Sequence, residues 1–423
     1  MRIRFHTAAG ETGVRYPGEQ IAIEVDGLVP GEPCTIRLAR RWRDAGWQAW
    51  LEARADAGGT VDTRTAVPLA GSYAGADPDG LFWSMTRTAG EAEVTTGWRC
   101  AVAQGDQRAH AVLEAGTLRP GIRAEPLPDD GGGGIGVVGM LYVPEAGEPR
   151  GAVLCLGGSG GGLEGAAESA QALANHGFVT LALAYFGAPG LPASLAAIPL
   201  EYFDAALDRL RAHPAVRPDR IGVLGRSRGG ELALLLGAER PELAAVVAAV
   251  ASPYRWTGVD GGPAWTRGGA AVAYLGGTGA PARRHLSDGR TLIATAPVSQ
   301  RTLATADAAT LEAACCAIER TRGPILLLAG DDDQVWPSAE LAARAAERLT
   351  RRTVRYADEA ITYPGAGHAA VSLPGNPTTE PVLRHPMGFW LMLGGTPDGD
   401  ARAQRAAWDR VREFLRRHLA GAA

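Results

Sequence analysis

The chain has 423 residues, more than one hydrophobic core usually holds, so we expect two domains. Its formal net charge of −4 gives no reason to expect a nucleic-acid partner, and the absence of lysine among its 42 basic residues indicates a GC-rich genome rather than a function. The five cysteines are odd in number and lack the spacing of metal ligands, which fits buried thiols in a reducing cytoplasm.

The N-terminal part, residues 1–130, carries short strand patterns separated by turn signals. These patterns, for example at 20–25 and 34–38, recur at intervals of roughly ten residues, a spacing typical of an all-β sandwich. A run rich in Asp and Gly at 128–134 then predicts a flexible joint or a hairpin turn. We therefore expect one domain over 1–130 and a second over 131–423.

The second part alternates between strand and helix patterns. Strands are predicted near 135–143, 152–156, 179–185, 221–225, 244–250, 325–329 and 353–356. Helices are predicted at 166–176, 201–213, 231–238, 338–350 and 401–419. Such alternation indicates a mostly parallel, doubly wound sheet. A Gly/Ala-rich insert near 255–320 interrupts it, and inserts at this place commonly cover an active site.

A glycine-rich loop, Gly-Gly-Ser-Gly-Gly-Gly at 157–162, directly follows the strand pattern at 152–156. Such a loop can bind phosphate, or it can supply backbone N–H groups to an oxyanion. The dinucleotide-binding pattern also needs an acid at the end of the next strand, and that strand ends in Ala-Tyr-Phe. We therefore interpret Gly158 and Ser159 as oxyanion-hole donors.

A Gly-x-Ser-x-Gly motif at 225–229 stands between a β-branched run and an apolar helical pattern. This order predicts a tight strand–turn–helix in which Gly225 and Gly229 lack side chains because the two elements approach each other. The turn presents Ser227 as a nucleophile. The backbone N–H of Arg228, at the start of the helix, becomes a further oxyanion donor.

A serine nucleophile needs a base and an orienting acid, which follow it in the order acid, then histidine. Three aspartates follow the strand at 325–329, and Asp333 has the offset expected for the acid, whereas Asp331 and Asp332 are interpreted as solvated turn residues. His368 ends a short strand and a small-residue loop, which makes it the predicted base. His385 is the one competitor for that role.

Four motifs occur in order along both halves of the chain: the stretch at 71–85, Leu-Ala-Tyr-Phe at 183–186, Leu-Glu-Tyr-Phe at 200–203 and Tyr-Pro-Gly-Ala-Gly-His at 363–368. With these motifs the chain resembles the acyl-CoA thioester hydrolase / bile acid-CoA:amino acid N-acyltransferase family. The resemblance implies an immunoglobulin-like N-terminal domain, an α/β-hydrolase domain, a triad of Ser227, Asp333 and His368, and an acyl-thioester substrate. Family members that transfer the acyl group to amino acids tend to use cysteine, so the serine favours hydrolysis.

The predicted reaction is hydrolysis of acyl-CoA or another acyl thioester through an acyl-serine intermediate. No metal or bound cofactor is expected, and coenzyme A enters as part of the substrate. Three alternatives stay open: acyl transfer to an amine or hydroxyl, ester or dienelactone-type hydrolysis, and a non-catalytic binding protein. An acyl carrier protein could replace CoA as the carrier. We expect no membrane insertion, because charges interrupt the most apolar stretch at 232–251, and a cytoplasmic location, because the N-terminus lacks a signal-peptide pattern.

Overall fold

The computed structural model describes residues 1–423 apart from 43–44, 89–95, 128–135, 146 and 421–423. The described chain forms two compact units. The smaller one comprises Met1–Arg119, Leu373–Glu380 and Thr396–Arg402, and the larger one comprises Pro120–Ser372, Pro381–Gly395 and Ala403–Ala423. The Gly-rich run expected to join two domains near residue 130 lies outside the described residues. The units divide after Arg119, so that strand β12 (Ile122–Pro126) belongs to the larger unit.

The smaller unit is built from two β-sheets that share one hydrophobic core. The first sheet has the order β2 (Gly10–Thr12), β1 (Arg2–Thr7), β4 (Ala22–Asp26), β7 (Val61–Asp62). The second has the order β3 (Val14–Arg15), β11 (Gln107–Ala115), β10 (Trp98–Gln104), β5 (Pro33–Trp42), β6 (Ala45–Arg54), β8 (Ala70–Gly71), with β9 (Thr86–Thr88) also paired to β6. Burial alternates along β6 and β10, so every second side chain enters the core.

The stretch at 71–85 folds into a loop and the short helix α1 (Gly80–Trp83) that fill this core. Asp79 is 1% exposed and accepts a hydrogen bond from the Ile21 N–H at 2.9 Å. This bond connects the loop to the residue that directly precedes β4. A Cβ on Gly80 would lie 2.2 Å from the Tyr73 ring, so this position requires glycine. The residues that carry the family resemblance in this half therefore have a structural role.

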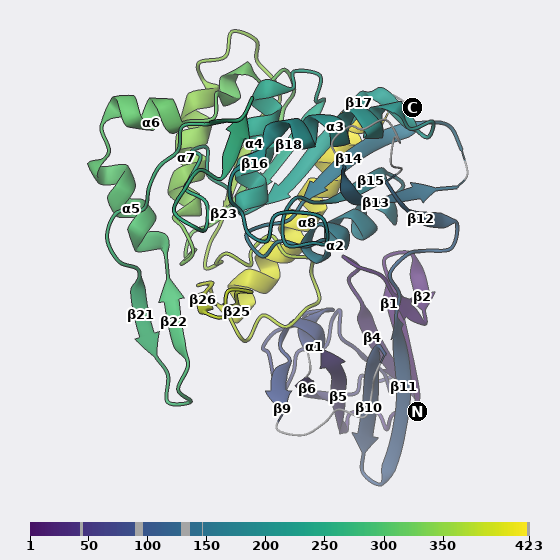
Figure 1. Ribbon diagram of the computed structural model, residues 1–423. Helices are drawn as coiled ribbons and strands as arrows, with labels where there is room; N and C mark the ends of the chain where they lie inside the picture. Colours follow the sequence, from purple (N-terminus) through teal and green to yellow (C-terminus); the bar gives the residue numbers. More distant parts are fainter. Residues whose placement is uncertain (43–44, 89–95, 128–135, 146, 421–423) are drawn as a thin grey trace. The chain divides into compact units, whose positions relative to one another are not determined.

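The larger unit is organised around an eight-stranded sheet (Figure 1). Its order is β12, β13 (Val138–Pro144), β15 (Val179–Ala184), β14 (Arg150–Leu156), β17 (Val216–Arg226), β18 (Ala245–Ala249), β23 (Ile325–Gly330), β24 (Glu359–Tyr363). β13 pairs antiparallel with β12 and β15, and the other pairs are parallel. The prediction of a mostly parallel sheet is confirmed, and this order with one antiparallel strand near the edge is the α/β-hydrolase arrangement.

Helices pack against this sheet because its central strands are apolar on both faces. They are α2 (Glu164–Ala174), α3 (Leu200–Ala212), α4 (Arg228–Glu239) and α7 (Ser338–Leu349), followed by α8 (Pro397–Leu419), whose first residues belong to the smaller unit. The predicted helices are all present. No helix in the described part of the chain is both long enough and apolar enough to cross a membrane.

The strand predicted at 353–356 is wrong. Val354 in this segment is 58% exposed, and the position beside β23 is taken by β24, which pairs from Leu326↔Glu359 to Gly330↔Tyr363. A β-branched pattern forms a strand only where a neighbouring strand can receive its hydrogen bonds. The sequence pattern could not show which of two nearby segments would reach β23.

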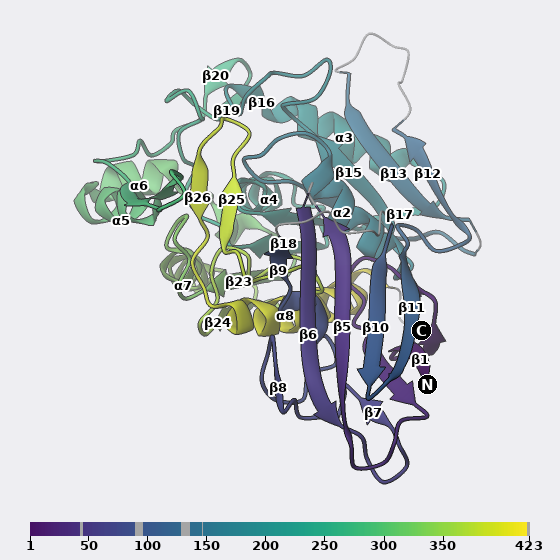
Figure 2. The same cartoon turned by 90° about the horizontal axis from the view of Figure 1, so that it is seen from below.

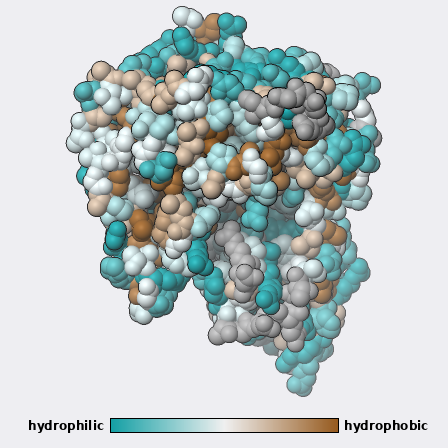
Figure 3. Space-filling view, viewed as in Figure 1, coloured by the Kyte–Doolittle hydropathy of each residue, from teal (hydrophilic) through white to brown (hydrophobic). Residues whose placement is uncertain are grey.

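The insert at 255–320 contains more regular structure than its weak pattern indicates. It holds β19 (Trp265–Arg267), β20 (Ala270–Ala271), β21 (Ala282–His285), β22 (Thr291–Ala294), α5 (Ala296–Thr305), α6 (Ala308–Ala314) and a 3₁₀ turn at Ile318–Arg320. β19 pairs with β16 (Ile198–Pro199), and β21 and β22 form a sheet with β26 (Trp390–Met392) and β25 (Val382–Arg384). The strands are too short for a clear alternation. Figure 2 shows β25 and β26 side by side, and Figure 3 shows mixed hydrophilic and hydrophobic side chains where the β21–β22 hairpin projects.

Candidate active site

Ser227 lies in the sharp turn between the end of β17 and the start of α4. Its backbone has φ 58° and ψ −121°, a conformation that a residue with a side chain adopts only under constraint. The constraint is visible at the neighbouring glycines. A Cβ on Gly225 would lie 1.9 Å from the Gly229 carbonyl oxygen, and a Cβ on Gly229 would lie 2.3 Å from the Gly157 carbonyl oxygen. The predicted close approach at Gly225 and Gly229 is confirmed.

Ser227, His368 and Asp333 form one chain of hydrogen bonds. His368 Nε2 lies 3.0 Å from Ser227 Oγ, and His368 Nδ1 lies 2.8 Å from Asp333 Oδ2. A carboxylate can only accept, so Nδ1 carries a hydrogen and Nε2 is left to accept the serine hydroxyl hydrogen. The structure brings together the three residues that the sequence singled out as nucleophile, base and acid.

Asp333 is held by its second carboxylate oxygen. Oδ1 accepts hydrogen bonds from the N–H groups of Val335 at 2.9 Å and Trp336 at 3.2 Å, and the residue is 6% exposed. The carboxylate therefore cannot rotate without losing both bonds. This fixes Oδ2, and with it the imidazole ring of His368, in the orientation that faces Ser227.

The other two aspartates of this loop are exposed but also hydrogen-bonded. Asp331 Oδ1 accepts from the Gly365 N–H at 2.7 Å, in the loop that leads to His368. Asp332 Oδ2 accepts from the Gly395 N–H at 2.9 Å, and its Oδ1 accepts from Gln334 Nε2 at 2.7 Å. Their interpretation as solvated turn residues is thus incomplete, because each also ties the acid loop to a neighbouring segment.

The predicted oxyanion donors Gly158 and Arg228 lie beside the serine. A Cβ built on Gly158 would lie 3.3 Å from Ser227 Cβ and 3.8 Å from its Oγ. Arg228 is the first residue of α4, where backbone N–H groups have no partner within the helix. Ser159 follows Gly158, and its Oγ lies 3.3 Å from His385 Nε2. His385, the competitor for the role of base, therefore faces Ser159 and not Ser227.

A buried acid one turn into α4 was missed by the sequence analysis. Glu231 is fully buried and pairs with Arg228 Nη1 at 3.1 Å, while Trp265 Nε1 donates to it at 2.7 Å. Burial raises the pKa of Glu231 to about 7, against the opposing effect of the Arg228 charge. Trp265 belongs to the insert, so Glu231 connects the insert to the helix that begins at the nucleophile. The three-residue spacing from Arg228 is the signal that could have indicated this pair.

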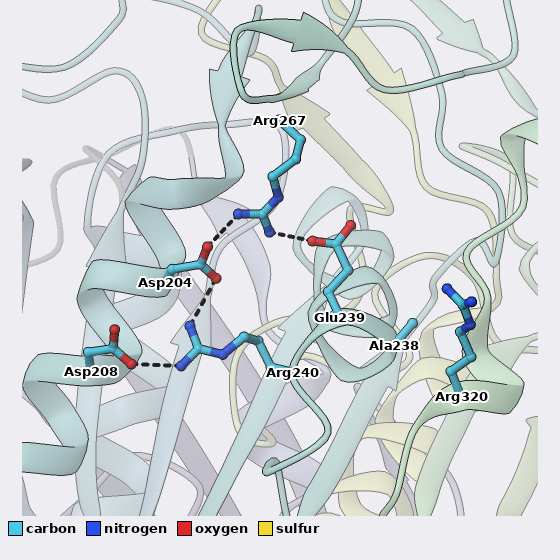
Figure 4. Close-up of a pocket in the computed structure, with 7 residues that line it drawn as sticks. All are labelled: Asp204, Asp208, Ala238, Glu239, Arg240, Arg267 and Arg320. Carbon is cyan, nitrogen blue, oxygen red and sulfur yellow. Dashed lines mark hydrogen bonds and ion pairs between the residues drawn. The ribbon is translucent and has the colours of Figure 1, made fainter.

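One hollow in the larger unit reaches the triad acid. It has a volume of about 300 Å³, and Asp333 lines it together with Pro297 of α5 and Ser338 of α7. Another hollow, of about 690 Å³, is lined by ion pairs, in which Arg240 binds Asp204 at 2.9 Å and Asp208 at 2.7 Å (Figure 4). None of the triad residues lines this other hollow. Among the described residues, no cluster of three or more His, Cys, Asp or Glu is arranged to hold a metal ion.

The sequence matches two family models. The model described as "BAAT / Acyl-CoA thioester hydrolase C terminal" covers residues 198–421, and the model described as "Acyl-CoA thioester hydrolase/BAAT N-terminal region" covers residues 18–109. Acyl-coenzyme A thioesterase 2, mitochondrial, of Rattus norvegicus is 32% identical over 95% of this chain and 87% of its own length. Acyl-coenzyme A thioesterase 1 of Homo sapiens is 31% identical over 95% of this chain and 94% of its own length.

Solved structures of similar arrangement include a putative dienelactone hydrolase from Klebsiella pneumoniae. It is 16% identical, covers 70% of this chain and 98% of its own, and has a TM-score of 0.40. A hyperthermophilic esterase from Pyrobaculum calidifontis is 17% identical, covers 70% of this chain and 85% of its own, and also has a TM-score of 0.40.

Proposed function

Because the chain belongs to the acyl-CoA thioester hydrolase / bile acid-CoA:amino acid N-acyltransferase family, we propose that it hydrolyses acyl-CoA thioesters with Ser227 as the nucleophile. The observation that carries this proposal is the hydrogen-bonded chain from Ser227 through His368 to Asp333. Family membership supplies the class of substrate, and the geometry supplies the groups that would act on it.

In the proposed reaction, His368 Nε2 takes the proton of Ser227 as the serine oxygen attacks the thioester carbonyl. The backbone N–H groups of Gly158, Ser159 and Arg228 would receive the oxyanion, and the positive end of the α4 dipole adds to this stabilisation. The thiolate leaves readily because its conjugate acid has a pKa of about 8.5, and it takes the proton from His368, which becomes a base again. His368 then takes a proton from water as the water oxygen attacks the acyl-serine carbonyl, and this proton returns to Ser227 Oγ as the free acid leaves. Groups of this chain perform each step, and coenzyme A enters only as part of the substrate.

We propose that the smaller unit is an immunoglobulin-like sandwich. Its strand order supports this: β1, β4 and β7 lie in one sheet, while β5, β6, β10 and β11 lie in the other, and β3 crosses to pair in parallel with β11. We propose that the boundary between this domain and the hydrolase domain lies between Arg119, where the two compact units divide, and residue 130. A cytoplasmic location is proposed because all five cysteines are buried free thiols.

The test is release of free thiol from a panel of acyl-CoA esters and acyl carrier proteins, with mass analysis of the acyl product. Wild type should release thiol and free acid, whereas Ser227→Ala should fold but lose on the order of 10⁶-fold in turnover. A conjugate with an added amine in place of free acid would instead support acyl transfer. Activity of the alanine variant above a few per cent would show that another residue is the nucleophile.

A further inference from the structure

The β25–β26 hairpin contacts three loops of the candidate active site: the loop after β23 that holds Asp333, the loop after β24 that holds His368, and the glycine-rich loop. Just after β26, the Leu393 carbonyl accepts hydrogen bonds from the N–H groups of His368 at 2.8 Å and Gln334 at 3.3 Å. His368 belongs to the loop that follows β24, the histidine loop, and Gln334 belongs to the loop that follows β23, the acid loop. The turn at the opposite end of the hairpin carries His385, whose ring reaches Ser159 of the glycine-rich loop. One small element therefore connects the parts that must be aligned for catalysis.

The ring of His385 is held in one orientation. The residue is 5% exposed, and its ring stacks on Phe389 with a centroid distance of 4.6 Å and an interplanar angle of 7°. Its backbone N–H donates to the Phe389 carbonyl at 2.8 Å, and the Gly388 N–H donates to the His385 carbonyl at 2.8 Å. The tight turn and the stacking together leave the imidazole little freedom.

The same contacts decide which ring nitrogen carries the hydrogen. The Met387 N–H donates to His385 Nδ1 at 3.3 Å, so Nδ1 is an acceptor and Nε2 carries the hydrogen. Burial lowers the pKa of His385 and so favours a neutral ring. A hydrogen bond to the Ser159 backbone has the opposite, smaller effect on this pKa. Nε2 therefore donates toward Ser159, whose Oγ lies 3.3 Å away. His385 is a donor here, and it is directed away from the nucleophile.

The glycine-rich loop depends on anchors outside itself. Five of its six residues are glycines, which have no side chains to restrict the backbone. Tyr185 Oη donates to the Gly157 carbonyl at 2.6 Å at one end, and the Gly162 N–H donates to the Phe186 carbonyl at 2.8 Å at the other. In the middle of the loop, the side chain of Ser159 offers the attachment point that His385 uses. Gly158, the preceding residue, is the one that lies against Ser227.

We propose that His385 is a positioning residue that fixes Ser159 and thereby directs the backbone N–H groups of Gly158 and Ser159 toward the oxyanion. This rests on the proposed function, because it assumes that an oxyanion forms at Ser227. His385 does not contact the reacting atoms. Since the oxyanion exists only in the transition state and the tetrahedral intermediate, a displaced loop should lower kcat and leave KM nearly unchanged.

The test replaces the donor while keeping the ring. His385→Phe retains an aromatic ring for stacking on Phe389 but cannot donate to Ser159, and His385→Gln restores a donor. We expect His385→Phe to lower kcat by about 10- to 100-fold, less than the 10²- to 10³-fold loss on removal of an oxyanion donor itself, with KM changed by less than about threefold. His385→Gln should recover part of this loss. His285→Phe, at an exposed histidine of the same small sheet, is the matched control and should leave kcat unchanged.

Two ligands separate positioning of the oxyanion donors from general damage. A trifluoromethyl ketone analogue of the substrate forms an oxyanion on Ser227, whereas a non-hydrolysable thioether does not. In His385→Phe, affinity for the ketone should fall in parallel with kcat and affinity for the thioether should not. Equal weakening of both ligands, a loss of kcat matched by lower thermal stability, or an unchanged kcat would each overturn the proposal.

A fluorophosphonate probe separates failure of this inference from failure of the proposed function. The probe reacts with the serine, and its phosphoryl oxygen occupies the same donors whatever the natural substrate is. If wild type releases no thiol from any acyl-CoA, the proposed function is wrong. The inference then still stands if His385→Phe is labelled more slowly than wild type and His285→Phe, and it is refuted if the three proteins are labelled at equal rates.

Discussion

Replacing the triad acid by its amide should almost abolish turnover, for a reason that the contacts of Asp333 make specific. In Asp333→Asn one of the two carboxylate acceptor oxygens is replaced by an NH₂ group that can only donate. The N–H groups of Val335 and Trp336 both point at the position of Oδ1, so the amide oxygen must occupy that position. The amide NH₂ then faces His368 Nδ1, which has to become an acceptor.

The consequence is an imidazole in the wrong tautomer. With its hydrogen on Nε2, His368 would donate toward Ser227 Oγ across the 3.0 Å contact and could no longer accept the serine proton. The opposite amide orientation would place the NH₂ group against the two N–H donors. Because Asp333 is only 6% exposed, these donors would then lack an acceptor, which makes this orientation unfavourable. We therefore expect kcat to fall by about 10⁴-fold, equivalent to about 5.5 kcal/mol of transition-state stabilisation.

The assay is thiol release from an acyl-CoA ester under saturating substrate, with Asp331→Asn and Asp332→Asn as matched controls. Both control residues are exposed and hold neighbouring loops through backbone N–H groups, so their amides should keep kcat within about tenfold of wild type. Thermal melting would confirm that all three variants are folded. If Asp332→Asn were the inactive variant and Asp333→Asn retained activity, the assignment of the acid and the tautomer argument would both be refuted.

Three further outcomes are expected. Gly225→Ala should destabilise the protein by about 3 kcal/mol or more, because its Cβ would lie 1.9 Å from a backbone oxygen, whereas Gly276→Ala, with no atom within 4 Å of its Cβ, should melt like wild type. Burial raises the pKa of Glu231 from 4.5 to about 7, so the folded state alone holds this proton between those values. Stability in urea should therefore fall as pH rises through that window, by at most about 3 kcal/mol, and Glu231→Gln should flatten the fall; an unchanged slope would contradict this. Ser227→Cys should keep partial activity and form more N-acylglycine when glycine is present, because an acyl-cysteine is itself a thioester; an active variant with an unchanged product ratio would show that acceptor access decides the product.

The sequence by itself determined the parts of this protein that depend on local patterns. The apolar run before Ser227 and the helical pattern after it predicted the strand–turn–helix, and the two flanking glycines are where the backbones meet. The alternation of strand and helix patterns along the chain predicted the mostly parallel sheet. The strands were recognisable as continuous apolar runs because the strands of such a sheet are buried on both faces. The order of serine, acid and histidine then predicted which side chains would meet.

Only the tertiary structure decided the features that depend on partners distant in sequence. Residues 353–356 had a strand pattern, but 359–363 reached β23, because a strand is selected by the neighbour that completes its hydrogen bonds. The insert showed little pattern because its strands are short, and two of them, β19 and β22, pair with β16 and β26, which lie outside it. His385 looked like an alternative base in the sequence. Its position was decided by the Phe389 stack and the turn at Met387, which direct its hydrogen toward Ser159 rather than Ser227. A side chain's role at a site depends on where its polar atoms point, and packing from the whole fold sets that direction.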